Sequence, residues 1–212
     1  PADGTASFDS ARAMFRAVIC AAGPEQMMTD ASFAVAQEPP WSVWRDTALC
    51  FLAEAHLLTG DVDQATAMFA ESSALAAAMG NTDSLVDSEA ELAVLAMDRG
   101  RWVDAAGHVE RALAAVDEYR MHDYVTSVLA FAVAARLAVH RGDLKESHRQ
   151  LTQAMRARPT CTFVLPWLAV RTRLQLAKVY WGMGDHTTAR HLQREIDDIL
   201  LHRPDLGALV DE

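Results

Sequence analysis

Lysine is scarce in this 212-residue chain, and its scarcity limits what the chain can bind. Lys145 and Lys178 are the only two lysines, and the formal net charge is −10 at pH 7. A protein that holds a nucleic-acid backbone neutralises phosphates with a surplus of lysine and arginine. The composition therefore argues against direct nucleic-acid contact by this chain.

Long apolar runs are missing as well. No run reaches the roughly 18 residues that a membrane-spanning helix needs, although 51% of the residues are apolar. We therefore expect a folded, cytoplasmic protein with no membrane span. The cysteines are few and odd in number (Cys20, Cys50 and Cys161), which favours buried free thiols in a reducing compartment over disulfides. The chain begins without Met or a signal peptide, so we expect a piece of a longer protein.

Motifs that carry catalysis or bind metals do not occur either. His186 and His191 stand five residues apart, a spacing that does not place both on one helix face, and no H-E-x-x-H or paired-cysteine motif accompanies them. No Ser-His-Asp or Cys-His grouping and no G-x-x-x-x-G-K-[ST] phosphate loop is present. We expect no enzyme activity, no metal site and no cofactor site in this chain.

The sequence does contain a repeat. Glycines recur at intervals of 40 to 42 residues, each with one small residue seven positions before it and another five positions after it. The four sets are Ala53, Gly60 and Ala65; Ala93, Gly100 and Ala105; Ala135, Gly142 and Ser147; and Ala177, Gly184 and Ala189. Small side chains at matched places let two antiparallel helices approach closely, and a two-helix repeat of this length is typical of an α-solenoid.

The expected fold is an all-α solenoid of about five antiparallel helix pairs in a single domain spanning 1–212. Glycine can take the left-handed conformation that ends a helix, and an aspartate after it, such as Asp185, can cap the next one. The first pair is a degenerate repeat, and Pro204 closes the last. The repeats are expected at about 8–38, 41–80, 82–119, 121–158 and 161–202.

This pattern resembles the tetratricopeptide (TPR) repeat. Phe69, Val109 and Leu151 supply the large apolar residue of the second helix, whereas Gln193 stands at that position in the last repeat. The longer period resembles the sensor region of large ATP-binding LuxR-type transcriptional regulators, the class that includes the maltose-regulon activator. The resemblance is closest at 38–45 (EPPWSVWR) and from 165–170 (LPWLAV) through 203–207 (RPDLG).

The resemblance implies a regulatory domain that senses an effector or partner and relays it to separate domains. An N-terminal domain outside this chain would bind ATP, and a helix-turn-helix domain beyond its C-terminus would contact DNA. The alternative is a protein–protein interaction scaffold with no small-molecule ligand. A homodimer of the isolated region also remains open, because its end helices are apolar.

The resemblance also places a ligand groove. In TPR-like arrays the first helices line a concave groove, and the positions ten, six and three before each glycine point into it. The candidate groove residues are Glu54, Arg136, Arg171, Lys178 and Trp181. Such a groove would be locally cationic and would hold an anionic or aromatic effector or an acidic partner segment. The alternative is that these are ordinary surface charges beside a partly exposed tryptophan.

Overall fold

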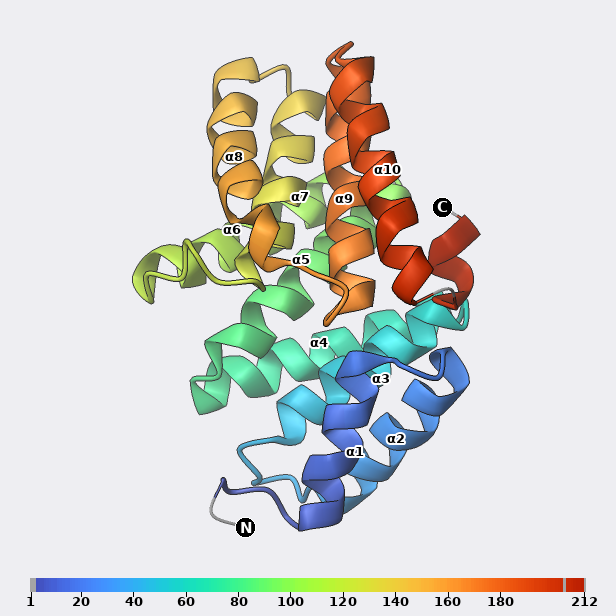
Figure 1. The fold of residues 1–212 in the computed structure, drawn as a ribbon. Coiled ribbons are helices and arrows are strands. Elements are labelled where there is room, and N and C mark those ends of the chain that lie inside the picture. Colours follow the sequence, from blue (N-terminus) through green and yellow to red (C-terminus); the bar gives the residue numbers. More distant parts are fainter. Residues whose placement is uncertain (1–2, 204, 212) are drawn as a thin grey trace.

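A computed structural model describes residues 3–203 and 205–211, and every regular element formed by those residues is a helix (Figure 1). This confirms the predicted all-α class. The elements in chain order are α1 (Phe8–Ile19), α2 (Pro24–Gln37), α3 (Arg45–Leu58), α4 (Val62–Met79), α5 (Thr82–Asp98), α6 (Trp102–Glu118), α7 (Ser127–His140), α8 (Leu144–Ala157), η1 (Arg158–Thr160), α9 (Pro166–Gly182), α10 (His186–His202) and η2 (Gly207–Asp211). Pro204, expected to close the last pair, lies outside the described residues.

The turn between α9 and α10 shows how each pair is closed. Gly184 has a φ of +83°, a left-handed conformation that costs glycine little because it has no Cβ. The backbone N–H of Thr188 then donates to Oδ1 of Asp185 at 3.0 Å, which satisfies one of the unpaired N–H groups at the start of α10. The turns after α3 and α7 repeat this arrangement with Asp61 and Asp143.

The small residues of the repeat are buried where helices meet. Those of the second, third and fourth pairs are fully buried: Ala53, Ala65, Ala93, Ala105, Ala135 and Ser147. In the last pair Ala189 is buried, but Ala177 is only half-buried. The difference arises because no further helix pair stacks on α9 and α10 within the described part of the chain.

The way the pairs stack changes along the array. In the N-terminal part the second helix of one pair packs on the first helix of the next, as α2 does on α3 and α4 on α5. Toward the C-terminus the first helices pack directly on one another, as α5 does on α7 and α7 on α9. The first helices α5, α7 and α9 therefore lie next to one another, and we call the region where they meet the axis of the array.

The C-terminal pair also returns to the N-terminal helices. The Nε1–H of Trp167, at the start of α9, donates to the backbone oxygen of Val18 at 3.0 Å. The short helix η2 lies against α3 and α9, and Figure 1 shows the C-terminal segment beside the N-terminal half of the molecule. The array is thus curled tightly enough for its two ends to touch.

Candidate functional site

The axis of the array is filled by buried charged side chains. Arg171 is 1% exposed, and its Nε lies 3.4 Å from Oε1 of Glu91, which is itself buried. Glu54 on α3 is 0% exposed. The resemblance to TPR arrays predicts that Glu54 and Arg171 face an open groove, but in this structure neither side chain is accessible to a ligand. The reason is the tight packing of the first helices, which covers positions that face the axis.

Arg136 connects four helices. Its guanidinium donates to Oε1 of Gln175 on α9 at 2.8 Å and to Oδ1 of Asp98 on α5 at 2.6 Å. It also lies 5.8 Å from the centre of the Trp102 ring on α6. Only 17% of the Arg136 side chain is exposed. These contacts give Arg136 a structural role between α5, α6, α7 and α9.

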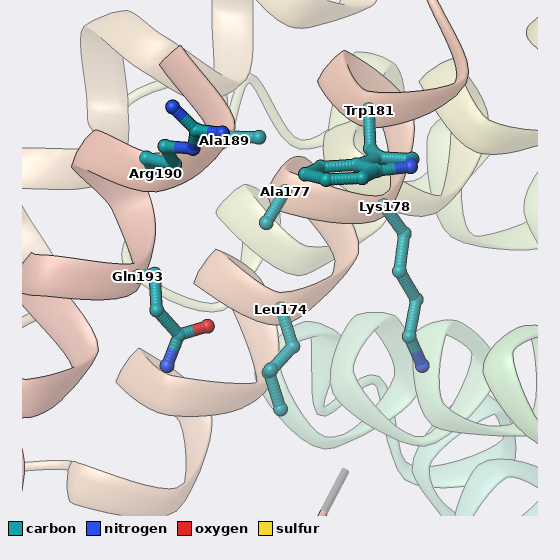
Figure 2. A pocket seen from close by; sticks show the side chains of 7 residues that line it. All are labelled: Leu174, Ala177, Lys178, Trp181, Ala189, Arg190 and Gln193. Atoms are coloured by element: carbon teal, nitrogen blue, oxygen red, sulfur yellow. The ribbon is translucent and has the colours of Figure 1, made fainter. Parts of the chain in front are cut away.

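Lys178 and Trp181 lie instead on an open surface at the end of the array. They line a cavity of about 410 Å³ between α9 and α10, which we call the terminal pocket. Its lining residues are Leu174, Ala177, Lys178, Trp181, Ala189, Arg190 and Gln193 (Figure 2). The structure therefore does not bring the five candidate residues together in one accessible site.

The repeat itself builds the terminal pocket. Ala177 and Ala189, the small residues of the last pair, lie on the facing helices α9 and α10, and Figure 2 shows Ala177 between Leu174 and Trp181 along α9. The Trp181 side chain is 58% exposed, and its ring lies 4.4 Å from the ring of His186, measured between centroids. Within the described residues, the surface between α9 and α10 is therefore an apolar floor with an indole at one end.

Sequence reasoning missed Leu174, Arg190 and Gln193 as lining residues. One signal was present, because Gln193 replaces the apolar residue that is buried as Phe69, Val109 and Leu151 in the preceding pairs. A polar residue at that place is expected where the second helix faces solvent instead of a following repeat.

The lining residues suit recognition rather than catalysis. Lys178 and Arg190 supply positive charge, Gln193 supplies an amide, and the floor and indole supply apolar contact. Arginine binds carboxylates with paired N–H donors, and indole rings contribute large contact areas. The terminal pocket can therefore hold an acidic ligand that also carries an apolar group.

No group of three or more His, Cys, Asp or Glu side chains in the described residues is arranged to hold a metal ion. None of the helices formed by those residues is both long enough and apolar enough to cross a membrane.

Residues 11–204 match the family described as the MalT-like TPR region. Among solved structures, the chain is similar to BtubC (BKLC) from P. vanneervenii, with 15% identity, a TM-score of 0.54, and coverage of 85% of this chain and 73% of that one. It is also similar to kinesin light chain TPR-like repeats from Podosopora anserina, with 18% identity, a TM-score of 0.51, and coverage of 90% and 91%. These similarities concern the fold. No curated protein matches the chain.

Proposed function

This chain belongs to the MalT-like TPR region family, and we therefore propose that it is the regulatory region of a cytoplasmic, ATP-binding LuxR-type transcriptional regulator. In this proposal it senses an effector or partner and relays its occupancy to separate ATP-binding and DNA-binding domains. The observation that carries the proposal is the family match over 11–204, which spans nearly every helix of the array.

We place the binding surface at the terminal pocket and propose an acidic, amphipathic partner segment as its ligand. Leu174, Ala177 and Trp181 follow one another over two turns of α9, a stripe about 10 Å long. A stripe of this shape accommodates the apolar side of a helix or an extended segment. Lys178 and Arg190 beside it favour carboxylates, and they do so on a chain whose net charge is −10.

One observation favours the simpler alternative, a protein interaction scaffold with no small-molecule ligand. Positions that would face a small effector on the axis of the array are occupied by internal contacts, as in the Arg171–Glu91 ion pair and the Arg136–Gln175 hydrogen bond. The terminal pocket, by contrast, lies open on the surface, where a protein segment can reach it.

The proposed relay is a population shift. A ligand that binds one curvature of the array better than another favours that curvature, and the attached domains respond to the difference. Helix α9 is suited to carry such a change, because it lines the terminal pocket, packs on α7 and holds Arg136 through Gln175.

Two screens test this function. In the first, acidic amphipathic peptides are titrated into the protein and binding is followed by calorimetry and tryptophan fluorescence. In the second, small metabolites are screened for an increase in the melting temperature. Peptide binding supports the terminal pocket as a partner site, whereas a stabilising metabolite supports effector sensing.

The matched variants reverse charge at two exposed positions each. We expect Lys178→Glu/Arg190→Glu to weaken peptide binding at least about tenfold, since it turns attraction into repulsion. The control, Arg12→Glu/Arg149→Glu, changes two exposed arginines on α1 and α8 and should bind like the wild type. Equal binding by both double variants would remove the terminal pocket from the proposal.

A further inference from the structure

A second cavity of about 280 Å³ lies where the beginnings of α3, α5 and α9 meet the end of α1. Three aromatic side chains line it, namely Trp44, Phe51 and Trp167, and we call it the aromatic pocket. The indole N–H groups are already committed, because Trp44 donates to the backbone oxygen of Asp3 at 2.7 Å and Trp167 to that of Val18. The rings therefore offer the pocket carbon surface and π-electrons rather than donors.

The charged groups that line the aromatic pocket are all acidic. Asp83 and Asp87, one turn apart on α5, contribute carboxylates, and the lining contains no lysine, arginine or histidine. Asp83 lies at the exposed rim, where Oγ1 of Thr126 donates to its Oδ1 at 2.9 Å. Carboxylates and aromatic rings without a balancing positive charge are the groups that bind cations.

Asp87 has an unused acceptor. Its side chain lines the pocket but is only 4% exposed. Its Oδ2 lies 3.5 Å from Sγ of Cys50, whereas no described group donates a hydrogen bond to its Oδ1. A buried acceptor without a donor loses the hydrogen bonds it had with water, so a ligand that supplies a donor gains that energy.

The surroundings of Asp87 oppose its ionisation. Burial, followed by the charge of Glu91, raises the pKa of Asp87 to about 8. The titratable and charged groups around it are Cys50 and Glu54 on α3, Asp83 and Glu91 on α5, Arg171 on α9, and Cys161 ahead of α9. Arg171 pairs with Glu91, one turn further along α5. In the empty pocket at pH 7, Asp87 is therefore mostly protonated.

We propose that the aromatic pocket binds a small primary ammonium ion, with Oδ1 of Asp87 accepting an N–H hydrogen bond and the rings of Trp44, Phe51 and Trp167 surrounding the cation. A primary ammonium fits better than a quaternary one because only the former can donate to Oδ1. On binding, Asp87 releases its proton to solvent and the ammonium keeps its own, so a neutral carboxyl and a cation become an ion pair and a free proton. This site uses none of the residues of the terminal pocket and does not depend on the proposed function.

The test is calorimetry of the protein with three probes of similar size: n-butylammonium, n-butanol and tetramethylammonium. We expect n-butylammonium to bind at least about tenfold more tightly than the other two. From pH 6 to pH 8 its association constant should rise about 50-fold, because ionised Asp87 becomes about 50-fold more abundant around a pKa near 8. Titrations at pH 7 in buffers of different ionisation enthalpy should show release of nearly one proton.

Asp87→Asn is the critical variant, because it keeps the shape of the side chain and replaces a carboxyl that is mostly neutral at pH 7. Thermal unfolding verifies that it is folded. It should bind n-butylammonium at least about tenfold more weakly and lose the pH dependence, whereas Asp104→Asn, on exposed Asp104 of α6, should behave like the wild type. The proposal is overturned if Asp87→Asn binds n-butylammonium as tightly as the wild type does. It is also overturned if the wild type binds n-butanol as tightly as n-butylammonium, binds tetramethylammonium more tightly, or binds none of the three probes.

Discussion

At the scale of single residues, equivalent places in the repeat have unequal environments. Glu54, Arg136 and Lys178 each stand six residues before a turn glycine, yet the first is buried, the second is partly exposed and the third is exposed. Repeat position alone therefore does not decide whether a side chain can meet a ligand. What decides it is how many helices surround that position, which depends on contacts with other pairs.

Asp87 should make stability depend on pH. Its pKa is about 8 in the folded protein and near 4 in an unfolded chain. Between these values the unfolded state gives up a proton that the folded state keeps, so stability falls as pH rises from 4 to 8. Asp87→Asn should remove this loss and raise the free energy of unfolding by a few kcal/mol at pH 7, measured by urea denaturation. Equal stabilisation at pH 4 and pH 8 would contradict the assignment.

The three thiols should be unreactive in the folded protein. Cys20, Cys50 and Cys161 are free and buried, and burial raises the pKa of Cys20 and Cys161 to about 12. Because the thiolate is the reactive form, a disulfide reagent such as DTNB should modify the native protein far more slowly than the protein in guanidinium. A cysteine that reacts in the native protein at the rate of a free thiol would show that its helix is open.

At the scale of elements, η2 depends on one close backbone approach. Gly207 has a φ of +54°, and a Cβ added there would lie 2.0 Å from the backbone oxygen of Leu58 at the end of α3. Gly207→Ala should therefore displace η2 and lower the melting temperature by several degrees. The control is Gly184→Ala, where φ is also positive but no atom lies within 4 Å of the added Cβ. An equal or larger effect in the control would mean that the contact with Leu58 contributes nothing.

The buried ion pair between α5 and α9 should be sensitive to loss of its cation. Arg171→Met leaves the carboxylate of Glu91 buried beside an apolar side chain, and breaking a buried pair typically costs about 3–5 kcal/mol. Arg190→Met, on the exposed side of α10, is the matched control and should change stability by less than about 0.5 kcal/mol. The free energy of unfolding is measured by chemical denaturation. Similar changes in the two variants would contradict the burial of the Arg171–Glu91 ion pair.

At the scale of the whole molecule, the sequence predicts the repeat better than the way the repeats stack. The turn at Gly184 and Asp185 and the close approach at Ala53 and Ala65 follow from local chemistry, so their spacing was sufficient to predict helix pairs. The curl that brings Trp167 to Val18 joins residues 149 positions apart. No local pattern records such a contact, and for that reason the sequence does not predict the burial of Arg171.

In this structure the axis of the array is closed, whereas the surface at α9 and α10 is open. Arginine footprinting tests it directly, by treating the native protein with phenylglyoxal and locating the adducts by mass spectrometry. We expect rapid modification of Arg190, which is exposed, and protection of Arg171, which is buried, until the protein unfolds. Modification of Arg171 as fast as that of Arg190 would show that Arg171 is accessible and that an open groove runs along the axis.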